Sequence, residues 1–404
     1  MRLDEALALI ERIVHPVTET ETVRLGIAAQ RVLAEDVVSP IDVPGADNAA
    51  VDGYAVHFDD LAPMGETRLR VRGRAAAGHP LAEAVPRGTA VRVFTGALMP
   101  AGPDTVFMQE DCRVDGDWVV VPPGIKRGAN RRLAGEDVRR GARIIGVGAR
   151  LRPQDIGLAA SVGRDALCVF RPLRVAIFST GDEVRETGTS LPPGAVYDSN
   201  RYVLAALLAG LGCAVTDLGI LADRAATIRD ALAAAARDHD LLFTSGGVSV
   251  GEEDHVRAAI EALGRLHAWR VAIKPGRPVA LGQIGRVPFV GLPGNPAAAM
   301  VTFVTVARPL ILRLAGCTES RVLTFPVRTG FDARKKSGRR EFVRVRLAAE
   351  VGDGGLREAT RFPREGAGIL SSLVEADGLV VLDEDTTRLA RGATVPFLPF
   401  NEVR

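Results

Sequence analysis

Two segments of the sequence carry residues that could bind a phosphate and a divalent cation. The segments are VAIFSTGDE (175–183) and LLFTSGGVSVGEED (241–254), and each places small polar residues, glycine and acids after an apolar run. Glycine lets backbone N–H groups approach a phosphate closely, and carboxylates are ligands for hard cations. Because ligands bind beyond the carboxyl ends of strands in a parallel sheet, we expect both loops at one sheet edge. The alternative is a pair of tight turns with solvated acids.

The GVSVG stretch also matches the nucleophile elbow of serine hydrolases, which makes Ser249 a rival catalytic candidate. Such an enzyme needs an acid and then a histidine on later segments of the chain. The last histidine here is His267, only 18 residues further on, and the six histidines form no HxxxH pair. The order of the residues therefore argues against a hydrolase.

A third group of residues favours the binding of an anion. The segment AIKPGRPVA places Lys274 and Arg277 beside a proline-constrained turn, and GLPGNPAAAM places Pro293 and Asn295 just before a helical stretch. Cations on a rigid turn and free N–H groups at a helix N-terminus suit an anion, although an ordinary turn with a solvated lysine is the alternative. The loop DNAAVDGYA adds Asp52, a weak signal when taken alone.

The elements that must position these residues predict several domains. Strands alternate with helices over 169–316, which is typical of a doubly wound α/β sheet. Short alternating stretches over 66–125 predict a β-rich insertion, residues 1–43 look mainly helical, and the chain after 320 predicts a small β-barrel or sandwich. We therefore expect a multidomain α/β protein with four parts: a discontinuous helical linking or dimerisation domain (1–43 and 135–168), an inserted β-rich domain (44–134), an α/β domain (169–316) and a C-terminal β-barrel domain (317–404).

Composition and charge exclude several classes of protein. The chain has 404 residues, of which 47% are hydrophobic and 25% charged, and its net charge of +2 argues against a protein that coats nucleic acid. The four cysteines are scattered and show no metal-binding spacing. The amphipathic start and the short apolar run at 203–215 argue against a signal peptide and a membrane span. We expect a cytoplasmic protein.

Taken together, the motifs resemble those of the molybdopterin molybdenumtransferase family, the MoeA proteins related to the C-terminal domain of gephyrin. DNAAVDGYAV is similar to the family's DNSAMDGYAV, and RLAGEDV is similar to its RxxGEDI. The series continues over essentially the whole chain with VFTGALMPAGPDTV, STGDEV, YDSN, LGILADR, TSGGVSVGEED, IKPGRP and GLPGNP.

The resemblance implies a dimeric enzyme that inserts molybdate into adenylylated molybdopterin and releases AMP. By similarity, the catalytic candidates are Asp52, Thr95, Asp137, Glu183, Asp223 and Asp254. The candidates for binding the substrate are Gly246, Gly247, Ser249, Arg270, Lys274, Pro293, Asn295, Arg339 and Ser371, with Ser372 as the alternative to Ser371. Arg270 and Arg277 stand where family members commonly carry lysine, so the charge is kept but the geometry of the cation differs.

The chemistry of the substrates agrees with this set. Molybdate and a pyrophosphate both need cations and N–H donors, and cleavage of a phosphoanhydride favours a metal held by carboxylates. We expect Glu183, Asp223 and Asp254 to hold Mg2+, and Lys274, Arg270 and Arg339 to hold molybdate. Asp52 would come from the β-rich insertion or from the dimer partner.

Two other functions stay open at this point. A scaffold that binds molybdopterin without turnover would pass the cofactor to recipient apoenzymes or other molybdenum-cofactor enzymes, but the complete set of motif acids argues against it. A molybdopterin adenylyltransferase would share the α/β core, but the additional β domains argue against that. The sequence gives no preference between molybdate and tungstate.

Overall fold

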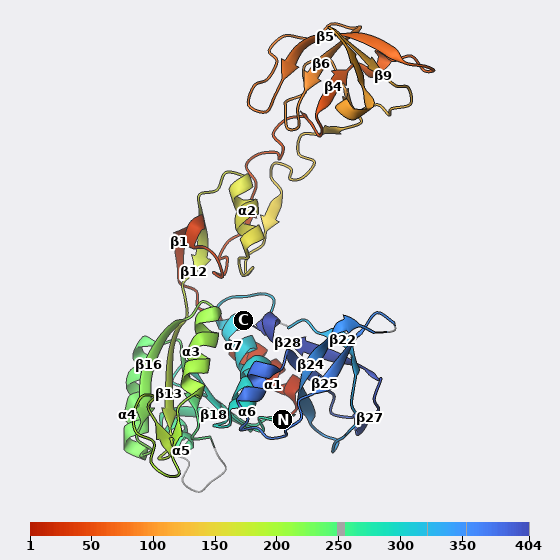
Figure 1. Ribbon diagram of the computed structural model, residues 1–404. Helices are drawn as coiled ribbons and strands as arrows, with labels where there is room; N and C mark the ends of the chain where they lie inside the picture. Colours follow the sequence, from red (N-terminus) through yellow and green to blue (C-terminus); the bar gives the residue numbers. More distant parts are fainter. Residues whose placement is uncertain (249–254, 321, 353, 404) are drawn as a thin grey trace.

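The computed structural model describes residues 1–248, 255–320, 322–352 and 354–403. Figure 1 shows an elongated chain with a β-sheet at one end, a narrow middle part and a larger body at the other end. We call the end sheet the distal β-domain (53–121). The larger body contains the α/β domain (174–314) and the barrel (325–399).

The α/β domain is built on a six-stranded sheet. Its strand order is β16-β13-β17-β21-β20-β18, in which the first four strands are parallel and the last two are joined antiparallel. The expected α/β architecture is confirmed, with an antiparallel edge that the sequence patterns did not indicate. The strands are β13 (Arg174–Thr180), β16 (Ala214–Leu221), β17 (Leu241–Ser245), β18 (Gly264–Arg270), β20 (Pro278–Ile284) and β21 (Val287–Leu292).

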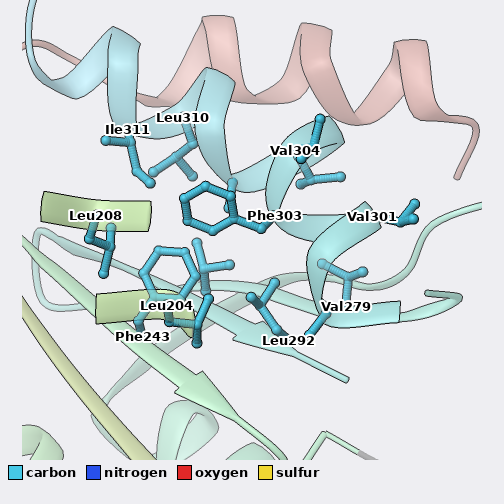
Figure 2. Close-up of a cluster of buried hydrophobic side chains, with 14 of the residues drawn as sticks. Leu204, Leu208, Phe243, Val279, Leu292, Val301, Phe303, Val304, Leu310 and Ile311 are labelled. Carbon is cyan, nitrogen blue, oxygen red and sulfur yellow. The ribbon is translucent and has the colours of Figure 1, made fainter. Parts of the chain in front are cut away.

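Helices cover both faces of this sheet because its central strands are apolar on both sides. In β13, Val175 and Ile177 belong to one buried cluster, whereas Ala176 and Phe178 belong to the other. Figure 2 shows the first cluster, in which Phe303 lies among aliphatic side chains. The helices are α3 (Asn200–Gly210), α4 (Ala225–Asp238), α5 (His255–Leu263), α6 (Pro296–Thr302), a π-helical segment (Phe303–Ala307) and α7 (Arg308–Leu314).

The continuous helix from α6 to α7 is apolar enough to resemble a membrane span. This stretch, Pro296–Leu314, has 19 residues and a mean hydropathy of 1.6, but 83% of it is buried inside the protein. Its side chains form the core of the α/β domain, which explains its hydropathy without a membrane.

The N-terminal region is less helical than the sequence indicated. It holds one helix, α1 (Leu3–Ile13), followed by the strand β1 (Thr20–Arg24) and a short 3-10 helix (Leu25–Ile27). The apolar stripe of α1 packs into the core of the α/β domain, and α1 contacts α7. β1 pairs with β12 (Ala166–Phe170) in the middle part, close to α2 (Pro153–Ser161). Between this 3-10 helix and residue 43, the chain forms a short strand at Val37–Val38 and isolated β-bridges rather than further helices.

The distal β-domain is one sheet with the strand order β7-β4-β6-β5-β9-β8. Two pairs of short strands lead from it toward the middle part: β3 (Asn48–Ala49) with β10 (Arg131–Arg132), and β2 (Val37–Val38) with β11 (Arg143–Ile145). The strands of the sheet are β4 (Gly53–Val56), β5 (Thr67–Ala75), β6 (Thr89–Val93), β7 (Thr105–Met108), β8 (Arg113–Asp115) and β9 (Trp118–Val121).

The C-terminal domain is the expected barrel. Five strands close on themselves in the order β24-β25-β22-β28-β26, because β26 pairs again with β24. A short strand of the α/β domain, β19 (Ile273–Lys274), pairs with the start of β24 and so joins the two domains. The barrel strands are β22 (Phe325–Thr329), β24 (Arg340–Val351), β25 (Arg357–Arg361), β26 (Gly378–Leu382) and β28 (Thr394–Pro399).

Candidate functional site

A pocket opens where the two sequence-predicted loops leave the sheet. β13 and β17 are parallel neighbours, with Ser179 opposite Ser245, so the loops that follow them lie side by side. The pocket has a volume of about 580 Å3. It is lined by Ser179, Thr180, Glu183, Val184, Val196, Tyr197, Asp198, Ser199, Asn200, Ser245, Gly246, Gly294, Asn295, Pro296, Gly368 and Leu370.

The floor of this pocket contains two hydroxyl groups that have no partner among the described residues. Ser179 and Thr180 are each only 2% exposed, and neither hydroxyl makes a hydrogen bond within the described part of the chain. A buried polar group without a partner costs about 1–3 kcal/mol. A ligand that accepts hydrogen bonds here would remove that cost, so the pocket is suited to a polar substrate.

Close packing at the pocket's edge requires glycine. Gly246 has a φ of +92°, and a Cβ at this position would lie 2.8 Å from the carbonyl oxygen of Thr180. Gly247 has a φ of +65°, and its Cβ would lie 2.6 Å from a methyl carbon of Thr180. The loop backbone therefore packs directly against Thr180 at the pocket, and the Gly246 N–H donates to the Leu292 carbonyl oxygen at 3.1 Å.

Asn200 connects three of the segments that line the pocket. Its Nδ2 atom donates hydrogen bonds to the Ser245 hydroxyl and to the Gly294 carbonyl oxygen, each at 2.8 Å. Asn295, the predicted residue of the GNP turn, is the N-cap of α6 and lines the pocket, whereas Pro293 is buried behind it. Sequence reasoning missed Asn200 as a functional residue, although it lies in the YDSN motif.

The predicted metal ligands are only partly described. Glu183 lines the pocket, and Asp223 follows β16, whose carboxyl end lies beside that of β13. Asp254 and Ser249 lie outside the described residues. In the parts of the chain that are described, no three His, Cys, Asp or Glu side chains form a metal site. Glu183 and Asp223 have no cationic partner among the described residues and are solvent-accessible, so their donor chemistry suits a hydrated hard cation such as Mg2+.

The predicted cations belong to a second group, on the turn after β18 and at the start of the barrel. Lys274 Nζ donates to Glu341 Oε2 at 3.1 Å, and Arg339 Nε lies 3.3 Å from Glu341 Oε1. Arg270 and Arg277 are exposed on the same turn. The turn packs against α6, because a Cβ at Gly276 would lie 2.4 Å from the Thr302 hydroxyl. α6 therefore has the pocket at its first residues, and the turn that carries Lys274 and Arg277 packs against its last residue, Thr302.

The barrel also contributes to the pocket wall. Gly368 and Leu370 line the pocket, and the backbone of Ala297 in α6 donates to the Ala367 carbonyl oxygen at 2.9 Å. Ser371 begins α8 (Ser371–Glu375) and is exposed. Ser372 is fully buried and hydrogen-bonds to Arg344 and to the Ile369 carbonyl oxygen. Of the two serines, Ser371 is the one whose hydroxyl is available to a ligand.

Asp52, which directly precedes the distal β-domain, forms a pair with the predicted residue Thr95 within it. Asp52 Oδ1 accepts hydrogen bonds from the backbone N–H and from the hydroxyl of Thr95, both at 2.8 Å. These bonds, with the backbone N–H as the larger cause, hold the pKa of the Asp52 carboxyl below its ordinary value. Its second oxygen makes no hydrogen bond within the described residues, which leaves a charged carboxylate oxygen available to a ligand.

The fold of one chain does not bring this pair to the pocket. Asp52 directly precedes β4, and Figure 1 places β4 at the opposite end of the molecule from β13 and α6. Asp137 is exposed between the distal β-domain and the middle part. The chain alone therefore gathers Glu183, Gly246 and Asn295 at the pocket, and leaves Asp52, Thr95 and Asp137 away from it.

Three family models together match most of the chain. Residues 1–163 match the model of the MoeA N-terminal region (domain I and II), 176–313 that of a probable molybdopterin binding domain, and 326–400 that of the MoeA C-terminal region (domain IV).

Individual relatives and solved structures give the same result. The chain is 39% identical to the molybdopterin molybdenumtransferase of Haemophilus influenzae, over 100% of this chain and 99% of that protein. It is 33% identical to the molybdopterin molybdenumtransferase of a Nostoc species, over 93% and 88% of the two chains. The crystal structure of a molybdopterin biosynthesis MoeA protein from Pyrococcus horikoshii superposes with a TM-score of 0.84 at 27% identity, over 99% of this chain and 100% of that one.

Proposed function

The chain belongs to the MoeA family of molybdopterin molybdenumtransferases, and from that membership we propose that it inserts molybdenum from molybdate into adenylylated molybdopterin and releases AMP. The observation that carries this proposal is the juxtaposition of two binding surfaces around α6. A polar pocket, with hydroxyls that have no partner among the described residues, lies at the first residues of α6, and the turn that carries the cations packs against its last residue, Thr302. Such a pair suits a substrate that carries phosphates and a second substrate that is a small oxyanion.

In this proposal the pocket holds the pterin and its pyrophosphate. The hydroxyls of Ser179 and Thr180 are donors for the phosphate oxygens, and Gly246, which lines the pocket without a side chain, lets the substrate approach the loop closely. Asn295, which is exposed at the pocket wall, adds a side-chain donor. These groups are held by the sheet and by Asn200, so they need little rearrangement when the substrate binds.

Lys274, Arg339 and Arg270 hold molybdate beside the pocket, with the exposed Ser371 as a further donor. Glu183 and Asp223, together with Asp254, would hold Mg2+. A bound Mg2+ would supply positive charge to the phosphates, which favours hydrolysis of the phosphoanhydride bond and release of AMP.

We further propose that the protein works as a homodimer. Asp52, Thr95 and Asp137 lie far from the pocket of their own chain, so a second copy is the simplest source of these residues at each site. In this proposal the protein acts in the cytoplasm and passes its product to recipient apoenzymes.

The direct test is to incubate the purified protein with adenylylated molybdopterin, Mg2+ and molybdate and to measure AMP. We expect AMP to form only when molybdate is present. AMP release without molybdate would contradict insertion. Tight pterin binding without AMP would indicate a scaffold, and adenylylation of molybdopterin from ATP would indicate an adenylyltransferase.

Replacing Lys274 by alanine tests the division between the two binding surfaces. The ammonium group is about half exposed and has one carboxylate partner within the described residues, so it is free to contact an oxyanion. Loss of one charge-assisted hydrogen bond should raise the molybdate concentration for half-maximal AMP release by about 10- to 100-fold. The KM for adenylylated molybdopterin should change much less, and an equal change in both would contradict this division.

A further inference from the structure

The two strongest candidates for holding molybdate share a buried carboxylate that sequence reasoning did not identify. Glu341 is 7% exposed and lies directly opposite Lys274 in the β19–β24 pairing. Its two oxygens divide between the cations: Oε2 accepts from Lys274 at 3.1 Å, and Oε1 lies 3.3 Å from Arg339 Nε. Lys274 belongs to the α/β domain and Arg339 to the barrel, so the carboxylate sits between cations from two domains.

The contact between Arg339 and Glu341 is not a completed hydrogen bond. Arg339 Nε and Glu341 Oε1 are both buried, and neither atom has a hydrogen-bond partner within the described residues. The side chains of Lys274 and Arg339 are 48% and 36% exposed, and neither makes another ion pair there. The carboxylate therefore offsets only part of the charge of these cations and does not occupy all their donors, which leaves donors for a ligand from solvent.

The neighbouring residue of the same strand shows what a structural ion-pair network looks like here. Arg340 points to the opposite side from Glu341, because side chains alternate along a strand. It pairs with Asp4 at 3.0 Å and with Glu384 at 3.1 Å, so one cation has two acids. On the Glu341 side, two cations share one acid, and the exposed Arg270 and Arg277 have no ion pair in the described part of the chain. The excess of cations marks this side as the one that receives an anion.

We propose that Glu341 is an internal counter-anion of the molybdate site, which weakens oxyanion binding and so sets how much molybdate the enzyme needs. This inference rests on the proposed function, because it takes Lys274 and Arg339 as the molybdate-holding cations. An oxyanion in hydrogen-bonding contact with both cations must lie within a few ångströms of the Glu341 carboxylate. At that separation, in a half-buried site, repulsion between a dianion and a carboxylate is strong.

Glu341 also has an opposite, favourable effect, because it holds the two cations in place. The binding free energy gained by holding the two cationic side chains in place is limited to the entropy of their rotamers. A bound dianion would itself hold the two side chains together. We therefore expect repulsion to prevail. Two cations without a carboxylate beside them would bind abundant anions such as sulfate. The consequence of Glu341 for function is that such anions do not fill the site.

The experiment measures binding of molybdate and, separately, of sulfate to the full-length protein by calorimetry. Glu341→Gln keeps the size of the side chain and removes its charge, and it should tighten binding of both oxyanions by about tenfold or more. Glu341→Asp keeps the charge and should stay close to the wild type. Lys274→Ala should weaken binding.

The matched control is Glu384→Gln. Glu384 is also a buried glutamate, 5% exposed, with one oxygen paired to an arginine and the other without a hydrogen bond in the described residues, but it faces Arg340. This variant should bind oxyanions as the wild type does. Circular dichroism checks that each variant is folded, and Glu341→Ala provides a second neutral variant with the same expected direction.

Three results would overturn the inference: unchanged or weaker oxyanion binding in the neutral Glu341 variants, a Glu341→Asp variant that behaves like Glu341→Gln, or an effect of Glu384→Gln of the same size. Calorimetry separates this inference from the proposed function. If the oxyanion affinities of the variants change as expected but no molybdate-dependent AMP forms, the proposed function fails and the role of Glu341 as a counter-anion stands. If AMP forms normally but the affinities do not change as expected, the proposed function stands and the role of Glu341 fails.

Discussion

Replacing Glu183 by glutamine is expected to lower molybdate-dependent AMP release by about 100-fold or more, since a metal ion contributes several kcal/mol to transition-state stabilisation. Glu183 lines the pocket, and its carboxylate has no ion pair within the described residues. Glutamine keeps the size of the side chain but removes the negative charge that holds a hard cation. The rate at saturating substrates should fall, and the residual rate should require more Mg2+ than the wild type.

The neighbouring Asp182 offers a matched control for this prediction. It is exposed, lies on the same loop and is absent from the pocket lining. Asp182→Asn should therefore retain most of the activity. Equal loss in both variants would indicate that the loop's total charge matters rather than a metal at Glu183, and an unchanged rate in Glu183→Gln would remove this residue from the mechanism.

The α/β domain was predictable from sequence because its strands and helices carry strong local patterns. β13 and β17 are buried on both faces and therefore read as continuous apolar runs ending in polar loops. The position of the loops follows from the general property that parallel strands end at one edge of a sheet. For this reason the sequence alone was enough to assign Glu183 and Gly246 to the same pocket.

The N-terminal region was harder to predict, because its sequence pattern does not specify which elements this region packs against. The apolar stripe of α1 predicts a helix, and the structure places that helix against α7. The following strand β1 is mostly exposed and has only one buried residue, Val23, so it lacks the alternation that would identify it. Its conformation is fixed by pairing with β12, which lies more than 140 residues further along the chain.

Glu341 could not be recognised from sequence for a similar reason. It lies within KKSGRREF, where a run of basic residues dominates and one acid looks like a solvated partner. Its burial comes from the pairing of β19 with β24, which brings two domains together. Asn200 differs from Glu341, because the motif that contains it could be seen in the sequence. Only its hydrogen bonds to Ser245 and Gly294 required the structure.

The separation of Asp52 from the pocket leads to a prediction about subunits. If each site combines the pocket of one chain with the distal β-domain of its partner, Asp52→Asn and Glu183→Gln should each abolish activity as homodimers. A heterodimer with one variant in each chain has one site that carries both changes and one that carries neither. Purified through two different tags, this heterodimer should recover about half of the wild-type rate, because one of two symmetric sites is intact.

A heterodimer of Glu183→Gln with Asp223→Asn is the control for this experiment. Both residues lie at the carboxyl edge of the same sheet, so each site of that heterodimer would carry one change and no site would be intact. It should stay inactive. If activity also returned in this control, the recovery would not depend on a site shared between the two subunits. If activity did not return in the heterodimer with Asp52→Asn, the Asp52 carboxylate would not belong to the site of the partner subunit. Since Asp52 is already bound to Thr95 through one oxygen, the variant keeps that acceptor and tests only the charge of the carboxylate.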